Sequence, residues 1–307
     1  MRIGIHVTPS GSAANAIDDL IGAAREAVDA GLAGFWLPQL FDIDALTALS
    51  VIGHEVPGIA LGTAVVPTYP RHPIVMAGQA LTVQAASGNR LHLGIGLSHQ
   101  IVIEGMFGYS FDRPARHMRE YLSALAPLLR GEQVSFQGET LKVATLAQMK
   151  VAGAEPCPIL VAALAPAMLK LTGQLADGTL TWMVGPKTLA NHVVPALTTA
   201  AAAARRPAPR VVVGLPVCVT DEPDQARQVA SKAFAIYNQL PSYRAMLDKE
   251  GAEGPADVAI VGKEEAVAAQ LADLTAVGAT EVVAAMFGSR DQRRRTLALL
   301  SDLGTAG

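Results

Sequence analysis

The chain has 307 residues, of which 50% are hydrophobic and 17% are charged, and its formal net charge is −3 at pH 7. A chain of this length and composition can bury a large core, so an intrinsically disordered protein is excluded. The only tight basic runs are Arg205–Arg206 and Arg293–Arg295, which we interpret as solvated helix ends, so we expect no nucleic-acid partner.

In chain order, short apolar runs alternate with longer amphipathic ones, a pattern typical of strand–helix units on a parallel sheet. The expected strands are residues 3–7, 35–37, 59–66, 91–96, 159–162, 179–182, 211–219 and 281–286. The clearest of the expected helices are residues 17–30, 44–54, 74–86 and 114–129. About eight such units predict an α/β protein with a TIM-type (β/α)8 barrel, forming a single domain over residues 1–307.

Two segments interrupt this rhythm, and we expect both to be insertions in the barrel. After the fourth strand the pattern loosens over residues 97–109, and residues 134–141 look like a hairpin or extended excursion. After the seventh strand, residues 223–256 are too long for one crossover helix and predict an extra helical excursion. Barrel enzymes carry their chemistry at the carboxyl ends of the strands, so we expect the site there.

The expected strand ends carry few ionised groups. The 7 histidines are scattered singly, which argues against a catalytic metal. Lys187 is the only lysine near a strand end, so a Schiff-base enzyme is also disfavoured. A mouth lined by glycine and small apolar residues suits an uncharged ring system better than a hydrolytic site.

A phosphate seat for such a ring-bearing cofactor is predicted after the fifth strand. Its small-residue loop enters a helix whose first turn holds Pro166, so free backbone amides and the helix dipole would face an anion. The residues concerned are Ala163, Leu164, Ala165 and Ala167.

Three stretches have a recognisable sequence: residues 35–39 (FWLPQ), 61–73 (LGTAVVPTYPRHP) and 88–96 (GNRLHLGIG). The chain thereby resembles the bacterial luciferase-like monooxygenase superfamily and, within it, the coenzyme F-420-dependent oxidoreductases. The resemblance covers nearly the whole chain. It implies a TIM-type barrel, usually dimeric, with a deazaflavin or flavin ring across the mouth and the cofactor phosphate at residues 163–167. It also implies a non-proline cis peptide in a bulge after the third strand, here Ala64–Val65, pressed against the ring.

The departures from the family narrow these expectations. Members that oxidise sugar phosphates have an Asp-His pair where Pro38 and Gln39 stand here, and a carboxylate where His99 stands, so glucose-6-phosphate is disfavoured as the substrate. The chain is shorter than the FMN-dependent members and lacks their larger loop insertions. This favours F-420 as the cofactor, with FMN as the alternative.

The strand ends also supply candidate site residues. His99 is expected to transfer a proton, because the unperturbed pKa of histidine suits that role near neutral pH; a loop histidine bonded to backbone is the alternative. Gln39 is expected to bond the polar edge of the ring or the substrate. Trp182 and His6 are expected at the cofactor beside Ala64 and Val65, although Trp182 could instead be a packing residue and His6 could lie in the barrel core.

The sequence thus predicts an F-420-dependent oxidoreductase that transfers a hydride between the deazaflavin and a small, mostly apolar organic substrate. The first alternative is an FMN-dependent monooxygenase that uses O2, and the second is a non-catalytic barrel that binds F-420 or a flavin.

The expected location follows from the absence of targeting patterns. No apolar stretch reaches the roughly 18 residues of a membrane span, and no charged-then-apolar leader is seen, so we expect a cytoplasmic protein. The resemblance implies that the protein is a homodimer. Cys157 and Cys218 form no CxxC pair and are expected to be buried.

Overall fold

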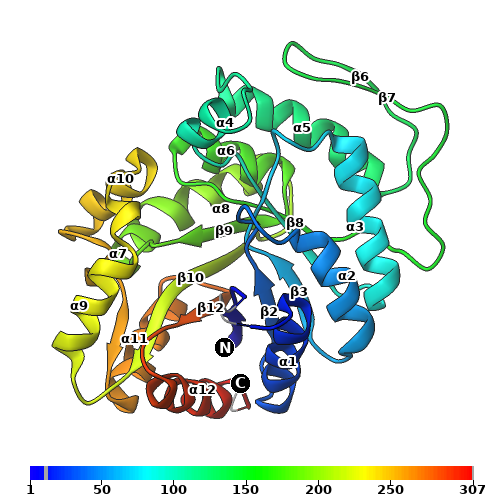
Figure 1. The fold of residues 1–307 in the computed structure, drawn as a ribbon. Coiled ribbons are helices and arrows are strands. Elements are labelled where there is room, and N and C mark those ends of the chain that lie inside the picture. The colour runs from blue at the N-terminus through cyan, green and yellow to red at the C-terminus, as the bar shows by residue number, and fades with distance from the viewer. Residues whose placement is uncertain (10–12, 306–307) are drawn as a thin grey trace.

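The computed structural model describes residues 1–9 and 13–305. Within them, eight parallel strands close into a barrel surrounded by helices, which confirms the predicted TIM-type (β/α)8 fold (Figure 1). The barrel strands are β1 (Arg2–His6), β2 (Gly34–Leu37), β3 (Ala60–Thr63), β5 (Leu91–Gly96), β8 (Ile159–Val161), β9 (Gly178–Trp182), β10 (Arg210–Val219) and β12 (Glu281–Met286). Strand β12 pairs with β1 and with β10, and β10 pairs with β9, so the ring is closed.

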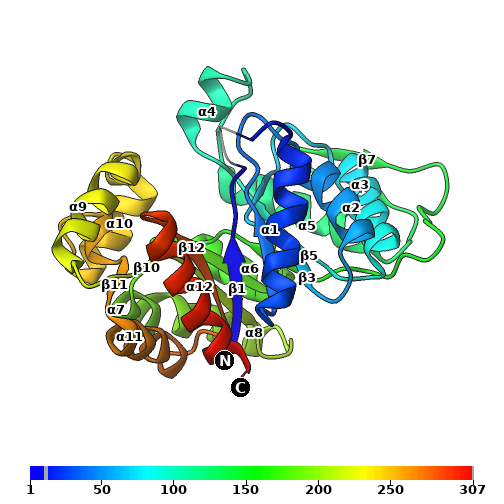
Figure 2. The same ribbon diagram turned by 60° about the horizontal axis from the view of Figure 1, so that its bottom comes forward.

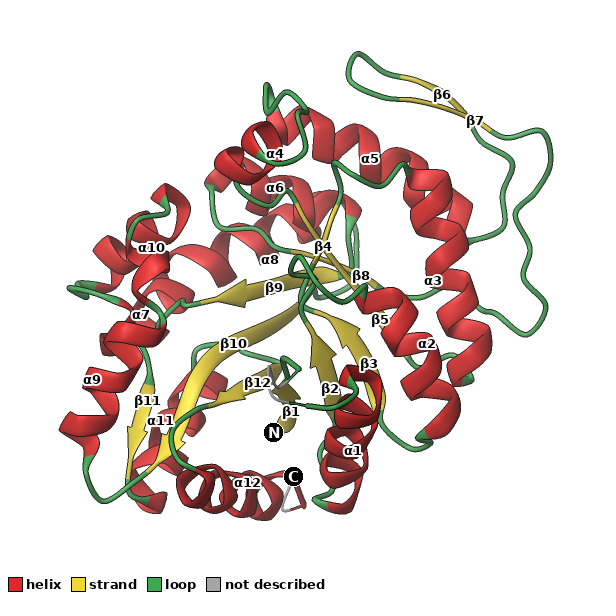
Figure 3. Ribbon diagram, viewed as in Figure 1, coloured by secondary structure: helices red, strands yellow, loops and turns green. Residues whose placement is uncertain are grey.

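The outer layer consists of helices that follow the strands (Figure 3). These are α1 (Ala16–Asp29), α2 (Ala45–Glu55), α3 (Pro73–Ser87), α5 (Pro114–Leu129), α6 (Pro166–Leu175), α8 (Val194–Ala203), α11 (Glu264–Ala276) and α12 (Arg290–Thr305). Local chemistry sets their ends: the Asn15 side chain accepts a hydrogen bond from the Ile17 amide at 2.9 Å, and Gly88 ends α3 in the left-handed conformation with φ of 63°. No helix in residues 1–9 and 13–305 is both long and apolar enough to cross a membrane.

The centre of the barrel is filled by one large side chain, that of Trp36. Its indole N–H donates to the Glu281 carboxylate at 3.0 Å, and the ring is only 1% exposed. A Cβ at Gly4, Gly34 or Gly62 would approach the Trp36 ring to between 2.0 and 2.9 Å, so these strands need glycine to make room for the indole. Trp36 is therefore a packing residue of the barrel interior.

Both predicted insertions are present. Between β5 and β8 the chain adds the short helix α4 (Gln100–Gly105) and a projecting hairpin of β6 (Ser135–Gln137) and β7 (Lys142–Ala144), seen at the upper right of Figure 1. After β10 it adds α9 (Pro223–Ala233), a 3-10 turn (Ala235–Asn238) and α10 (Pro241–Glu250). Sequence reasoning missed α4 and strand β11 (Ile260–Gly262), which pairs with β10. Figure 2 shows α4 at the end toward which β1 points, and α9 and α10 on the side away from the hairpin.

Candidate active site at the barrel mouth

The third strand is interrupted where it reaches the mouth. The predicted run 59–66 is not continuous: β3 ends at Thr63, and β4 (Val66–Pro67) then pairs with β5. The peptide bond between Ala64 and Val65 is cis, at the position that the resemblance implies. The interruption therefore forms a bulge at the carboxyl end of β3.

Two glycines of β5 allow this bulge to lie close against the barrel. A Cβ at Gly94 would lie 1.9 Å from the Thr63 carbonyl oxygen, and a Cβ at Gly96 would lie 2.7 Å from Val65 Cγ2. The Thr63 hydroxyl donates to the Gly94 carbonyl at 2.7 Å and accepts from the Gly94 amide at 2.8 Å. Ala64 and Val65 pack on the apolar interior of the barrel. The floor of the mouth is thus uncharged and has no room for side chains at these two glycines.

Beside the bulge, the ends of β1 and β9 bring His6 and Trp182 together. Their rings stack with centroids 5.3 Å apart and an interplanar angle of 20°. Burial lowers the pKa of His6 to about 4, an effect partly opposed by a hydrogen bond to the Ala64 backbone, so the imidazole is neutral at pH 7. The Trp182 indole N–H is buried and lies close enough to the Tyr237 hydroxyl to oppose the rise in pKa that burial gives that phenol, but it makes no hydrogen bond of good geometry among the described residues. His6, Trp182, Ala64 and Val65 therefore line one region, and its buried indole donor is poorly satisfied.

Further ring contacts, which are edge-on or tilted, lead from Trp182 into the insertion after β10. Trp182 contacts Tyr237 with ring centroids 5.9 Å apart, Tyr237 contacts Tyr243 at 5.0 Å, and Tyr243 contacts His99 at 5.7 Å. We call these five rings the aromatic arc. Burial raises the pKa of Tyr243 and of Tyr237, so both phenols keep their protons at neutral pH. Sequence reasoning assigned the two tyrosines no role, although their clustering in an insertion was a visible signal.

His99 lies immediately before α4, at the end of the arc. Its side chain does not cap the helix, and among the described residues its imidazole contacts Tyr243 and makes no hydrogen bond. Burial lowers the pKa of His99 below its usual 6.5, which leaves the ring neutral and able to accept a proton at pH 7. The structure therefore does not show the backbone-bonded loop histidine considered as an alternative.

Gln39 is placed differently, because both ends of its amide are used by its own loop. Its oxygen accepts from the Ala45 amide at 2.8 Å, and its nitrogen donates to the Ile43 carbonyl at 3.2 Å. Arg71 also contacts this oxygen and forms an ion pair with Asp44. Gln39 and Arg71 thus fix the loop between β2 and α2.

The loop after β8 has the features of an anion site. Ala165 is the N-cap residue of α6 and Pro166 follows at the first turn, and no side chain of the described residues caps the helix. Ala163 is buried and Ala167 is exposed. The Leu164 carbonyl accepts a hydrogen bond from His192 Nε2 at 2.8 Å. The amides at the start of α6 are therefore free to face an anion.

The neighbouring helix start, at the end of β9, is already occupied. Helix α7 (Pro186–Thr188) leads through a π-helical turn (Leu189–Val193) into α8. The Glu250 carboxylate of α10 accepts from the Lys187 amide at 3.1 Å and from the Thr188 amide at 2.7 Å. Of these two adjacent helix starts, only that of α6 is available to a phosphate.

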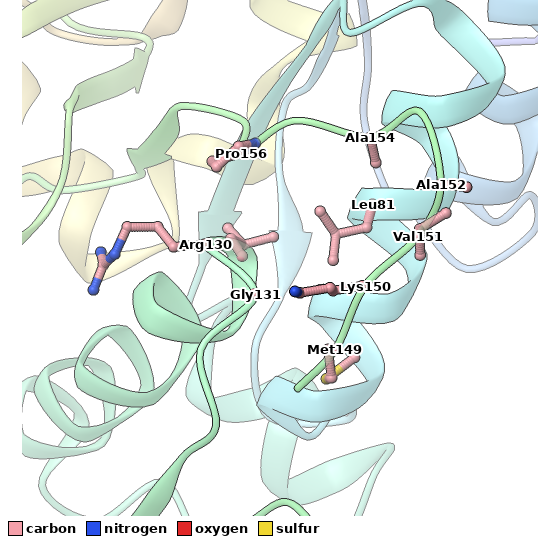
Figure 4. Close-up of a pocket in the computed structure, with 10 residues that line it drawn as sticks. Leu81, Arg130, Gly131, Met149, Lys150, Val151, Ala152, Ala154 and Pro156 are labelled. Atoms are coloured by element: carbon pink, nitrogen blue, oxygen red, sulfur yellow. The ribbon is translucent and has the colours of Figure 1, made fainter. Parts of the chain in front are cut away.

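Two other features of the described chain lie outside this site. Residues 1–9 and 13–305 contain no group of three His, Cys, Asp or Glu side chains placed to hold a metal ion. A cavity of about 490 Å³ between α3, the end of α5 and residues 149–156 is lined by Leu81, Arg130 and Lys150, among others (Figure 4). Because residues 149–156 lead into the start of β8, this cavity belongs to the opposite end of the barrel.

Comparison with known proteins identifies relatives along the whole chain. A family model described as luciferase-like monooxygenase matches residues 1–305. The 5,10-methylenetetrahydromethanopterin reductase of Methanolobus tindarius is 27% identical over 264 residues, which span 85% of this chain and 78% of that protein.

Solved structures share the fold at low sequence identity. The coenzyme F-420-dependent tetrahydromethanopterin reductase from Methanopyrus kandleri superposes with a TM-score of 0.81 at 20% identity, over 98% of this chain and 97% of that chain. A type II Baeyer-Villiger monooxygenase in complex with FMN, the oxygenating constituent of 3,6-diketocamphane monooxygenase from Pseudomonas putida, gives 0.77 at 15% identity, over 99% and 96%. The similar proteins thus include both an F-420-dependent and an FMN-bound member.

Proposed function

The chain belongs to the luciferase-like monooxygenase family and is an oxidoreductase, and from this premise we propose that it uses coenzyme F-420. The proposed reaction moves a hydride between the deazaflavin and a small, mostly apolar organic substrate. The observation that carries the proposal of a ring-bearing cofactor is the uncharged bulge floor beside an uncapped helix start, which together suit a flat ring with a phosphate tail. The similarity to an F-420-dependent reductase supports F-420 as that cofactor.

The residues present fit such a cofactor. Ala64, Val65, His6 and Trp182 would hold the ring, and the buried Trp182 N–H, which makes no hydrogen bond of good geometry, offers it a donor. Ala163, Leu164, Ala165 and Ala167 would hold the phosphate at the start of α6. When bound, the deazaflavin supplies the carbon that gives or takes a hydride.

His99 is the proposed catalytic residue for proton transfer. Its half-buried imidazole is neutral at pH 7 because burial lowers its pKa, so it can accept a proton from a substrate hydroxyl or position a donor hydrogen toward an oxygen. Because the Gln39 amide is engaged by its own loop, we do not retain Gln39 as a catalytic residue and propose that it positions that loop.

The second candidate is an FMN-dependent monooxygenase that uses O2, which the FMN-bound structural relative supports. The two candidates differ in an easily measured property: the monooxygenase consumes O2 with reduced FMN, whereas the F-420 enzyme reduces or oxidises its substrate without O2. Membership of a family of oxidoreductases argues against the non-catalytic barrel.

Two further expectations remain predictions. The homodimer implied by the resemblance is tested by sedimentation or light scattering of the purified protein, where a monomer at micromolar concentration would contradict it. The cytoplasmic location is tested by cell fractionation.

A further inference from the structure

We propose that α10 forms the substrate-side wall of the mouth and that Tyr243 is a specificity-determining residue, selecting an uncharged, flat, unsaturated substrate that carries a carbonyl group. This inference rests on the proposed function, because the cofactor ring is taken to lie against Ala64 and Val65. A substrate that approaches the ring from the mouth would then lie against the aromatic arc.

Tyr243 links His99 to the aromatic residues at the strand ends. It lies in the first turn of α10 and contacts Tyr237 at 5.0 Å and His99 at 5.7 Å between ring centroids. Through Tyr237 it connects to Trp182 and His6, which lie at the carboxyl ends of β9 and β1. A residue of the insertion therefore lies between the proposed proton-transfer residue and the proposed cofactor residues.

Helix α10 is held firmly against the barrel. Glu250 binds the first amides of α7, and a Cβ at Gly185 would lie 2.3 Å from the Glu250 carboxylate carbon, so this approach needs glycine. Met246 and Leu247 are buried, and the Thr188 hydroxyl donates to the Met246 carbonyl at 3.2 Å. The helix is thus a fixed wall, which is what selection by shape requires.

The wall that α10 forms presents aromatic side chains to the mouth. The aromatic arc consists of uncharged rings and includes no carboxylate, lysine or arginine. Ring faces favour contact with flat conjugated groups. Arg244, the guanidinium on the same helix, already donates to the Ala252 and Glu253 carbonyls at 2.7 and 2.8 Å. An anionic substrate would lose its hydration here without gaining a cation, whereas a carbonyl oxygen can accept a hydrogen bond from the protonated Tyr237 hydroxyl.

A matched pair of probes tests the chemical class. Isothermal titration of F-420-loaded protein with 2-acetylnaphthalene and with 2-naphthoate compares the same ring system with and without a charge. We expect 2-acetylnaphthalene to bind at least tenfold more tightly. Equal affinity, or tighter binding of 2-naphthoate, would overturn the proposal whether or not any variant folds.

A matched pair of variants tests Tyr243 itself. Tyr243→Leu keeps an apolar side chain but removes the ring, and we expect up to about tenfold weaker binding of 2-acetylnaphthalene. The control Phe136→Leu makes a similar change at a half-buried ring of the β6–β7 hairpin, on the other side of the molecule from α10, and should leave binding unchanged (Figure 1). Tyr243→Phe should retain the binding, and F-420 affinity should stay within about twofold of wild type in all three. Unchanged probe binding in folded Tyr243→Leu would overturn the role of Tyr243.

The same titrations on protein without cofactor separate the two proposals. If the wild type fails to bind F-420, the proposed function is contradicted. The wall is supported in that case if unloaded protein still prefers 2-acetylnaphthalene and Tyr243→Leu still weakens it, and it is overturned if these differences are absent.

Discussion

The rings of Tyr243 and His99 are in contact at the barrel mouth, with centroids 5.7 Å apart, although the two residues belong to the separate insertions that follow β10 and β5. Within the aromatic arc, this is the contact that joins the two insertions, because Tyr237 and Tyr243 belong to the one after β10 and His99 to the one after β5. The contact puts a neutral imidazole and a protonated phenol beside the proposed cofactor region.

Replacing His99 by alanine should remove proton transfer while leaving the cofactor site intact. We expect His99→Ala to lower kcat by about 100-fold or more, the usual contribution of a general acid or base. The F-420 dissociation constant should stay within about twofold of wild type, because the proposed cofactor residues are elsewhere. Turnover assays on a substrate accepted by the wild type, with a parallel F-420 titration, check both values. Unchanged kcat would remove His99 from the mechanism.

Adding a carboxylate at the start of α6 should stabilise the helix yet weaken cofactor binding. In Ala165→Asp the new side chain can accept from the open amides, a cap that contributes about 1 kcal/mol. The same carboxylate would repel the cofactor phosphate, so F-420 affinity should fall at least tenfold. Ala165→Asn caps without a charge and serves as the control, and it should bind F-420 more tightly than Ala165→Asp. Equal affinities of wild type and Ala165→Asp would place the phosphate elsewhere.

Acid should destabilise the protein through its buried histidines. Burial lowers the pKa of His6 to about 4, whereas the unfolded value is near 6.5, so only the unfolded chain gains this proton between those values. The stabilisation is complete above pH 6.5 and is lost as the pH falls toward 4, at about 1.4 kcal/mol per pH unit. Urea unfolding at pH 6 and pH 5 should show a smaller loss in His6→Asn than in wild type. Identical losses would contradict the neutral buried state of His6.

Weakening the attachment of α10 should loosen the wall without abolishing the fold. Glu250→Gln replaces a carboxylate at the start of α7 by a neutral amide, which should cost about 1 kcal/mol of unfolding free energy. Hydrogen exchange of α10 amides should become faster. Glu253→Gln is the control, since its exposed carboxylate lies beyond α10. Unchanged exchange in Glu250→Gln would show that the α7 contact does not hold α10.

Much of the fold could be predicted because periodicity encodes burial. The eight barrel strands, the main helices and both insertions follow from alternating apolar runs, and Pro166 marks the start of α6. Strand β11 and helix α4 were missed because they are short and depend on neighbouring elements for their stability.

The site was predicted in part, because strand ends can be located from the sequence whereas contacts between insertions cannot. His6, Trp182, Ala64 and Val65 lie together, as their positions at the carboxyl ends of three different strands indicated. The engagement of Gln39 by its own loop, and the contact of Tyr243 with His99, depend on how loops pack in three dimensions. Periodicity carries no information about such packing.

The most direct test is a fluorescence titration of the purified protein with oxidised F-420 and, in parallel, with FMN. We expect F-420 to bind more tightly than FMN and Ala165→Asp to weaken this binding. A preference for FMN would contradict the proposed cofactor and favour the oxygen-using alternative, and binding of neither would contradict the proposed site as a whole.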